Sequence, residues 1–361
     1  MTLTTVKTRY WHKTADNRIQ CDLCPRACKL RNGQRGLCFV RACENDEIVL
    51  TTYGRSSGFC IDPIEKKPLN HFYPGSPVLS FGTAGCNLAC KFCQNWDISK
   101  SRQMESLASS ATPEQLAHAA VELNCLSIAY TYNDPVIFHE YAIDVSQAAR
   151  ELGVKSVAVT AGYICPEPRR EFFAHMDAAN IDLKAFTEKF YYQLCGGRLS
   201  DVLDTILYVR HETNTWLELT TLIIPGENDS AKEIEALANW ILENLGPDVP
   251  LHLTAFHPDF LMRNKSHTSP HSLTLCREIA LKCGIHHVYT GNVNDALGGS
   301  TYCSNCNALL IKRNQYQLDY WYLDNSGRCK ECKTKLPGHY YEQPGNWGAK
   351  RQLVKLGTKA I

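Results

Sequence analysis

The chain has 361 residues, of which 44% are hydrophobic and 21% are charged, and its formal net charge at pH 7 is +1. This composition is typical of a globular protein and excludes a collagen-like, an intrinsically disordered and a membrane-embedded chain. No run of about 18 apolar residues is present, and residues 1–13 lack the apolar core of a signal peptide, so we expect a cytoplasmic protein with no membrane association.

The charge is distributed unevenly along the chain. Residues 1–60 carry ten Lys and Arg against five Asp and Glu, and residues 303–361 carry ten against four. One interpretation is a nucleic-acid surface at each end. We favour another, in which basic side chains offset the negative charge of thiolate metal sites, because both segments contain cysteine groups and neither has a long basic run.

The first of three cysteine groups has the spacing C-x2-C-x3-C-x9-C. In a reducing compartment, clustered thiols indicate metal ligands or catalytic groups rather than disulfides. Four thiols this close in sequence can enclose zinc or a second iron–sulfur cluster, and their spacing does not decide between the two, although we place zinc first. The group consists of Cys21, Cys24, Cys28 and Cys38.

The middle of the chain alternates β-rich segments with segments of helical period. We expect strands at residues 78–81, 126–132, 156–160, 179–184, 216–223, 251–256 and 287–290, and helices at 113–123, 136–152, 202–210, 231–245 and 273–283. Repeated strand–helix units predict parallel strands joined by right-handed crossovers. The predicted fold is therefore α/β: a partial or closed (β/α) barrel over residues 61–300, between small Cys-rich modules at residues 1–60 and 301–361.

The second cysteine group follows the first predicted barrel strand directly. Cys86, Cys90 and Cys93 have the spacing C-x3-C-x2-C. The same spacing would place three cysteines on one face of a helix, but Gly82 and Gly85 favour a loop, and barrel sites form at the C-terminal ends of strands. Three thiolates suit a [4Fe-4S] cluster, in which one iron stays open to bind a substrate or cofactor.

The third cysteine group contains two C-x2-C pairs separated by 22 residues. Such pairs close a tetrahedral zinc site with four thiolate ligands, which leaves no open position for catalysis, so we expect structural zinc rather than an auxiliary cluster. The intervening segment, residues 308–323, predicts a small β-hairpin whose aromatic residues serve in packing rather than in base stacking. The ligands are Cys303, Cys306, Cys329 and Cys332.

The central motif resembles that of the radical S-adenosylmethionine (SAM) enzymes, whose signature has an aromatic residue, here Phe92, before the last cysteine. Other segments resemble the subfamily called the AmmeMemoRadiSam system radical SAM enzyme, which is related to the pyruvate formate-lyase activating enzymes. The resemblance implies that the open iron binds the amino and carboxylate groups of SAM, and that one electron cleaves SAM to methionine and a hydrogen-abstracting 5'-deoxyadenosyl radical. These segments are CDLCPRAC (21–28), TYNDP (131–135), IDLKAF (181–186), LIIPGEND (222–229) and FHPDF (256–260).

The resemblance also implies residues around SAM. Asp134 stands where the family commonly has a glutamate that binds the SAM amine, although an Asp before Pro also begins helices. Ala161 stands where relatives often have asparagine, so a side-chain contact made there is lost. Asp182 and Lys184 follow the fourth strand and form either an ion pair or contacts near SAM or the substrate. His257, after the sixth strand, is a further candidate or a solvated loop histidine.

We therefore expect a radical SAM oxidoreductase that requires a [4Fe-4S] cluster, SAM, an electron donor and zinc, and that acts on a protein or a protein-bound group. The subfamily's name implies association with Memo-type and AMMECR-type proteins. One alternative is a radical SAM enzyme that modifies RNA, which the basic, aromatic C-terminal segment favours. Another is a non-catalytic metal- and SAM-binding scaffold, which would bind SAM without cleaving it.

Overall fold

The core of the molecule is one curved, open sheet. The structure is a computed structural model that describes residues 5–101, 107 and 109–356. Its main sheet has nine strands in the order β16-β15-β14-β13-β12-β11-β9-β8-β20, so β16 and β20 are free edges and the barrel is partial rather than closed. The seven consecutive parallel strands are β9 (Pro77–Phe81), β11 (Ser127–Tyr130), β12 (Lys155–Thr160), β13 (Ala178–Asp182), β14 (Trp216–Ile223), β15 (Leu251–Ala255) and β16 (Val288–Gly291).

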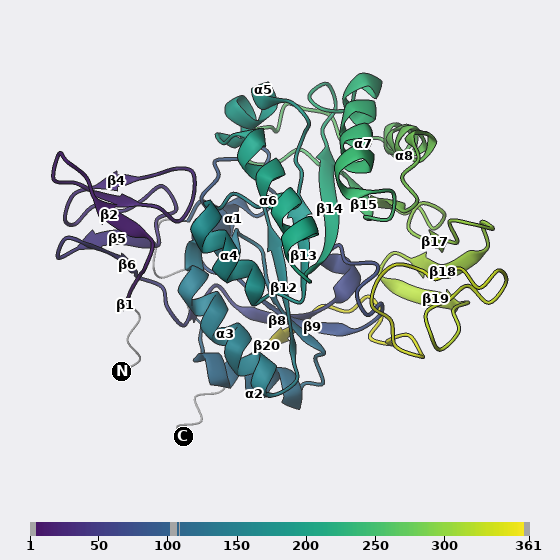
Figure 1. The fold of residues 1–361 in the computed structure, drawn as a ribbon, viewed down its shortest axis with the longest axis horizontal. Coiled ribbons are helices and arrows are strands. Elements are labelled where there is room, and N and C mark those ends of the chain that lie inside the picture. The colour runs from purple at the N-terminus through teal and green to yellow at the C-terminus, as the bar shows by residue number, and fades with distance from the viewer. Residues whose placement is uncertain (1–4, 102–106, 108, 357–361) are drawn as a thin grey trace.

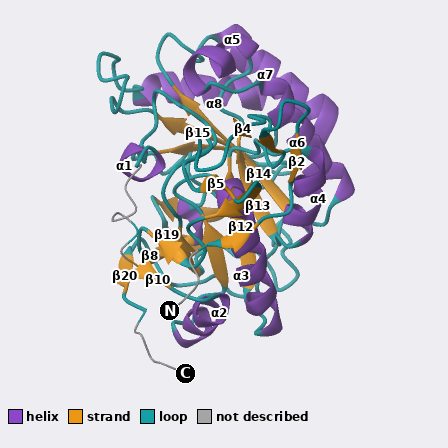
Figure 2. Ribbon diagram, turned by 90° about the vertical axis from the view of Figure 1, so that its left-hand side faces the viewer, coloured by secondary structure: helices purple, strands orange, loops and turns teal. Residues whose placement is uncertain are grey.

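All seven predicted strands are present, because a parallel sheet covered on both faces needs near-continuous apolar runs that are visible in the sequence. Helices follow the outer side of the sheet (Figure 2). They are α2 (Pro113–Glu122), α3 (His139–Glu151), α4 (Pro166–Ala174), α6 (Leu199–Glu212), α7 (Ala231–Leu245) and α8 (Pro270–Cys283), with the shorter α1 (Trp96–Ser99), α5 (Glu188–Phe190), η1 (Ile64–Lys66), η3 (Pro135–Phe138) and η4 (Tyr191–Cys195).

Local signals explain which helices the sequence revealed. At the start of α2, the Thr112 hydroxyl accepts from the Gln115 backbone N–H and the Gln115 side chain accepts from the Thr112 backbone N–H, which is a complete capping box. Helix α4 was not expected. It is only nine residues long and buries Pro168, Phe172 and Phe173, a set too small to show a clear helical period.

The two terminal modules lie on opposite sides of the core in the view of Figure 1. In the N-terminal module, β1 pairs with β6 and β6 with β5, while β2, β3 and β4 form a second small sheet. Strand β7 pairs with β10, and β8 joins the main sheet. The strands are β1 (Val6–Lys7), β2 (Trp11–Lys13), β3 (Ile19–Cys21), β4 (Lys29–Leu30), β5 (Arg41–Glu44), β6 (Glu47–Leu50), β7 (Arg55–Ser56), β8 (Phe59–Pro63) and β10 (Ser109–Ser110).

The C-terminal segment forms a three-stranded sheet and then returns to the core. Strand β18 pairs with β17 and β19, which confirms the predicted hairpin. Strand β20 then crosses to the main sheet, where Leu353 is paired with Cys60 of β8. The strands are β17 (Thr301–Tyr302), β18 (Leu309–Asn314), β19 (Gln317–Trp321) and β20 (Gln352–Val354). Among the residues that the structure describes, no helix is long and apolar enough to cross a membrane.

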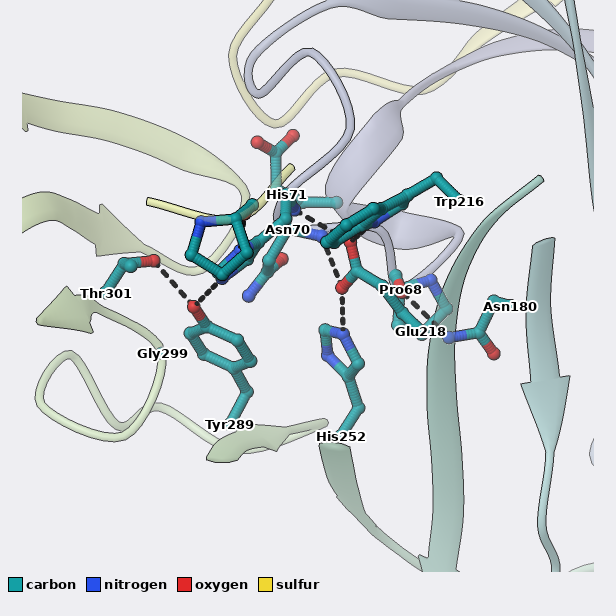
Figure 3. Close-up of polar contacts among 12 residues, drawn as sticks. Pro68, Asn70, His71, Asn180, Trp216, Glu218, His252, Tyr289, Gly299 and Thr301 are labelled. Atoms are coloured by element: carbon teal, nitrogen blue, oxygen red, sulfur yellow. Dashed lines mark hydrogen bonds and ion pairs between the residues drawn. The ribbon is translucent and has the colours of Figure 1, made fainter. Parts of the chain in front are cut away.

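A buried carboxylate holds the loop between η1 and β9 against the start of β14. Glu218 accepts hydrogen bonds from the backbone N–H groups of Asn70 (3.0 Å) and His71 (2.8 Å), and its side chain meets Trp216 Nε1 (3.0 Å) and His252 Nε2 (2.7 Å) (Figure 3). The chain of contacts continues from His71 to the Tyr289 hydroxyl at 2.6 Å. Because these groups are buried, Glu218 satisfies donors that water cannot reach.

Removing this carboxylate leaves several buried donors without an acceptor. We expect Glu218→Ala to lower the free energy of unfolding by about 3–5 kcal/mol, as loss of one partner of a buried ion pair does. Urea denaturation of the metal-loaded protein measures the effect. Glu243→Ala, which changes an exposed glutamate of α7, is the control and should shift the free energy by about 0.5 kcal/mol or less. Equal stability of the two variants would contradict the role of Glu218.

Candidate active site

The cysteine loop after β9 is held by two glycines that permit close backbone approach. A Cβ on Gly82 would lie 2.3 Å from the backbone oxygen of Thr131, in the loop after β11. A Cβ on Gly85 would lie 1.9 Å from the backbone oxygen of Cys38, and Gly85 also has a φ of +84°, which disfavours residues with a side chain. The loop is therefore packed between the main sheet and the N-terminal module.

The three cysteines of this loop line a cavity of about 390 Å³ at the C-terminal ends of the parallel strands. This confirms the loop interpretation of the motif, because a parallel sheet collects its functional side chains at that edge. Every parallel strand contributes to the wall or is followed by a residue that does. Besides Cys86, Cys90 and Cys93, the lining includes Phe92, Lys100, Tyr132, Asp134, Thr160, Ala161, Asp182, Lys184, Thr220, Thr254, Asn292 and Tyr316.

The three thiols have different surroundings. Burial raises the pKa of the Cys86 thiol to about 12, whereas a hydrogen bond from the Cys195 side chain lowers the pKa of Cys90 to about 6. Cys93 Sγ lies 3.0 Å from the Ser99 hydroxyl. Cys195, an isolated cysteine in the sequence, approaches Cys90 because the backbone N–H of Ala89 donates to its carbonyl at 2.8 Å. Its sulfur contact is a tertiary feature that sequence spacing could not indicate.

The donor set fits an iron–sulfur cluster. The three thiols are soft ligands that face one cavity. Their sulfurs do not all lie within 4.8 Å of one another. In the described part of the chain, that close spacing of ligand atoms is found at the C-terminal cysteines instead. Wider separation is expected around a cluster, because each thiolate binds a different iron.

Asp134 lies in the cavity wall and already has three hydrogen-bond donors. Its Oδ1 accepts from the backbone N–H of Val136 (3.0 Å) and the hydroxyl of Thr160 (2.9 Å), and its Oδ2 accepts from the backbone N–H of Ala161 (3.0 Å). Asp134 therefore caps the short helix η3 and links it to β12. Burial raises the pKa of Asp134, against these hydrogen bonds. Ala161 thus makes a polar contact through its backbone N–H, whereas from the sequence we considered only the loss of a side-chain contact at this position.

Asp182 and Lys184 face the cavity as an ion pair, with Lys184 Nζ 2.8 Å from Asp182 Oδ2. Burial acts to lower the pKa of Lys184, but Asp182 and the neighbouring thiols raise it well above its usual value, so the ammonium stays charged. Phe92 is buried and packs against Phe190, with ring centroids 5.5 Å apart. The pair thus joins the cysteine loop to α5.

His257 lies outside this cavity. Its side chain is 54% exposed, and its ring is hydrogen-bonded at 2.9 Å to the side chain of Gln94, which does line the cavity. The structure thus places His257 one residue away from the site and in solvent, as a loop histidine. A position after a strand was therefore not sufficient to predict contact with the cavity.

Comparison with known proteins identifies the family. The sequence profile described as the Radical SAM superfamily matches residues 81–241, which contain the cysteine loop and most of the cavity wall. An uncharacterized protein of Methanocaldococcus jannaschii is 38% identical over 328 residues, which cover 91% of this chain and 97% of that protein. The chain belongs to the radical SAM superfamily. This confirms the superfamily prediction, and the superfamily implies a [4Fe-4S] cluster and SAM.

Two relatives of this radical SAM protein have named activities. A GTP 3',8-cyclase of Peptoclostridium acidaminophilum is 28% identical over 165 residues, 45% of this chain and 50% of that protein. A pyruvate formate-lyase-activating enzyme of Clostridium pasteurianum is 22% identical over 182 residues, 48% of this chain and 72% of that protein. Both matches cover about half of the radical SAM chain, so they support the common core and leave its substrate to be proposed.

The radical SAM cavity also contains a buried cationic group that the sequence did not reveal. Lys67 Nζ lies 2.6 Å from Asp62 and 4.9 Å from the ring centroid of Tyr132, whose hydroxyl donates to Asp62 at 2.8 Å. Burial acts to raise the pKa of Asp62, and the Lys67 and Lys66 cations override it, so this carboxyl stays ionised. In the sequence, two adjacent lysines are typical of a solvated surface. Only the pairing of β8 with β9 brings them to the cavity.

The C-terminal cysteines form a compact four-thiol group. Cys303 and Cys332 have sulfurs 3.4 Å apart, and Cys306 and Cys329 have sulfurs 3.7 Å apart. All four sulfurs lie within 4.8 Å of one another, which confirms a metal-binding arrangement. A single tetrahedral metal ion fits between thiolates at these separations.

The N-terminal cysteines are arranged differently. They line an enclosed cavity together with Arg26, Arg41 and Asn87. Burial raises the pKa of the Cys21 thiol to about 12, and the Arg41 cation opposes this effect. The cavity walls are formed by Cys21, Cys24, Cys28 and Cys38, so the structure brings the predicted ligands together.

Substitution of Asp134 separates a role in SAM binding from a role in capping. If its carboxylate binds the SAM amine, Asp134→Asn should weaken SAM binding roughly tenfold to a hundredfold, because a charge-assisted hydrogen bond contributes about 1.5–3 kcal/mol. Asparagine can retain the contact to the Val136 N–H, so the cap is largely preserved. Equilibrium binding of SAM to the cluster-loaded protein measures the change. Unchanged affinity in Asp134→Asn would restrict the residue to its structural contacts.

Proposed function

We propose that the protein cleaves SAM reductively in the cavity that Cys86, Cys90 and Cys93 line, and that it abstracts a hydrogen atom from a protein substrate. One observation carries this proposal: the three thiols of the superfamily motif line a cavity that also contains a carboxylate and a buried ammonium. When bound, the cluster supplies the electron for SAM cleavage, and the 5'-deoxyadenosyl radical so produced takes the hydrogen atom.

In this proposal, different residues bind the cluster, the SAM ammonium and the SAM carboxylate, each according to its charge. The three cysteines hold the cluster, and the absence of a fourth cysteine in the motif leaves one iron for SAM. Asp134 is a suitable partner for the SAM ammonium, because Oδ2 accepts one hydrogen bond and has a further acceptor site. Lys184 is a suitable partner for the SAM carboxylate, because Asp182 keeps it positioned and charged.

We further propose that the C-terminal four-cysteine group binds structural zinc. With Zn–S bonds of about 2.3 Å, tetrahedral geometry separates the sulfurs by about 3.8 Å. The sulfur–sulfur separations of 3.4 and 3.7 Å in the structure are close to that value. The same module extends Tyr316 to the wall of the SAM cavity, so a metal that stiffens the module would also stabilise part of the site.

The cluster assignment predicts the behaviour of a triple variant. Changing Cys86, Cys90 and Cys93 together to alanine should remove about four iron and four sulfide per chain and abolish formation of 5'-deoxyadenosine, because no cluster ligand remains in the loop. Metal analysis and chromatography of the reaction products measure the two effects. Cys283→Ala, which changes a partly exposed thiol of α8, should leave both unchanged. Unaltered iron in the triple variant would refute the assignment.

The substrate class is tested by isotope transfer. We expect deuterium to appear in 5'-deoxyadenosine when the reduced enzyme and SAM are mixed with the protein fraction of cells grown on deuterated amino acids. The matched controls are the same fraction digested with protease, a ribonuclease-treated fraction and a small-molecule filtrate. Loss of transfer after protease treatment supports a protein substrate. Transfer that is lost only with ribonuclease, or that resides in the filtrate, would overturn it. The resemblance to glycyl-radical activating enzymes supports the first outcome.

A further inference from the structure

The chain contains two groups of four cysteines, and their geometries differ. The C-terminal sulfurs all lie within 4.8 Å of one another, and two pairs are 3.4 and 3.7 Å apart. This is the spacing expected for thiolates on one tetrahedral ion. Because both groups belong to the same structure, the sulfur–sulfur distances of the N-terminal group can be compared directly with those of the C-terminal group.

The N-terminal group does not have this spacing. Within the described residues, which include all of 21–38, no three of its sulfurs lie within 4.8 Å of one another, as the C-terminal sulfurs do. Instead, the four cysteines surround one cavity. Gly36 lies between two of them: the sulfurs of Cys28 and Cys38 are each 3.7 Å from the position that a Cβ on Gly36 would occupy. The thiols therefore enclose a space rather than meeting at a point.

The central triplet gives a second internal comparison. Cys86, Cys90 and Cys93 also face a common cavity, and in the described structure their three sulfurs do not all lie within 4.8 Å of one another. Thiolates spread around a space suit a multi-atom centre, because each ligand binds a different metal atom. In the spread of its sulfurs, the N-terminal group is similar to the central triplet and differs from the compact four-thiol site, and its cavity is smaller than the central one, about 20 Å³ against about 390 Å³.

A buried arginine supplies an independent indication of what the cavity holds. Arg41 is 1% exposed, and although its other nitrogens contact Ile137 O and Glu140, its Nη1 is buried with no hydrogen-bond partner. Arg41 lines the cysteine cavity, whereas the unpartnered Nη2 of Arg26 lies against Gly196, 3.0 Å from the position that a Cβ there would occupy. An unsatisfied buried cationic donor is costly, and an anionic centre with sulfur acceptors would satisfy Arg41 Nη1.

We propose that Cys21, Cys24, Cys28 and Cys38 hold a second [4Fe-4S] cluster rather than zinc. Four thiolates ligate all four irons, so this cluster has no open position for SAM and differs in that respect from the centre at the cysteine loop. Arg41 offsets its negative charge and donates to its sulfurs. The proposal reverses our preference for zinc at this group, a choice that the spacing of the cysteines did not decide.

The second cluster adjoins the central cysteine loop. The Cys38 carbonyl packs against Gly85, next to Cys86, and Arg26 Nε donates to the backbone oxygen of Asn87 at 2.9 Å. Asn87, between Cys86 and Cys90, is itself part of the N-terminal cavity wall. The two centres therefore share one packed interface, and loss of the N-terminal ligands should also disturb the loop that carries the central triplet.

The test uses the full chain with the central triplet changed to alanine, so that its result does not depend on SAM chemistry or on the proposed function. After anaerobic reconstitution with iron, sulfide and zinc, this variant should retain about four iron, four sulfide and one zinc per chain, with the Mössbauer spectrum of a four-iron cluster. Two zinc ions and no iron would overturn the proposal. So would one zinc ion and no iron.

Assignment to the four cysteines comes from further changes in the same background. Cys24→Ser should alter the absorption and Mössbauer spectra of the retained cluster, and Cys24→Ala should lower its iron content by half or more. Cys43→Ala is the matched control, because Cys43 is a buried cysteine of the same module that does not line the cavity. Retention of zinc at the C-terminal site shows that each variant is folded. A cluster unaffected by Cys24→Ala and lost in Cys43→Ala would contradict the ligand set.

Discussion

The structure depends on a close backbone approach on both sides of the cysteine loop. Gly82 passes against the Thr131 carbonyl and Gly85 against the Cys38 carbonyl, at separations that exclude any Cβ. The first contact fixes the loop over the C-terminal ends of the strands, where the cavity lies, and the second fixes it to the N-terminal module. Without these contacts, the three thiols would have no defined position relative to the carboxylate of Asp134 or the ammonium of Lys184.

Charge in the cavity is arranged in ion pairs, one buried and one partly exposed. Lys67 is held by Asp62 on one wall and Lys184 by Asp182 on another. A buried ion pair contributes little net stability, because the desolvation of both ions offsets their attraction. The value of such pairs here is positional: each carboxylate fixes an ammonium in the cavity wall, and Asp182 also raises the pKa of Lys184, so that this ammonium stays charged. The pairs also limit how many unpaired charges face the substrate.

The terminal modules contribute directly to the site. The N-terminal module supplies Cys38, against which the cysteine loop packs, and the C-terminal module supplies Tyr316 in the cavity wall. Glu218 connects the sheet to the loop that bears Asn70 and His71, and His71 in turn lies 2.6 Å from the Pro337 carbonyl. The core and its Cys-rich ends thus form one packed unit, so metal binding at the ends can affect the geometry of the centre.

Much of the fold and of the cysteine sites could be predicted from local sequence. Seven strands, the open or closed barrel class and the C-x3-C-x2-C loop follow from apolar runs, helical period and ligand spacing, which are properties of neighbouring residues. The pairing of the two C-terminal knuckles also follows, since a hairpin between them brings both C-x2-C turns to the same end. Asp182 and Lys184 could be placed together because alternate residues of a strand share a face.

Only the tertiary structure decided the remaining features. Closure of the barrel depends on whether the edge strands meet, and they do not, because β8 and β20 extend the sheet beyond β9. The contact between Cys90 and Cys195, the entry of Lys67 into the cavity beside Tyr132 and the ion pair of Arg41 with Glu140 all join residues far apart in the chain. The spacing of the N-terminal cysteines did not decide between zinc and a cluster, and only the tertiary structure separates this group from the compact C-terminal one, because the distances between sulfurs are set by how the surrounding chain packs.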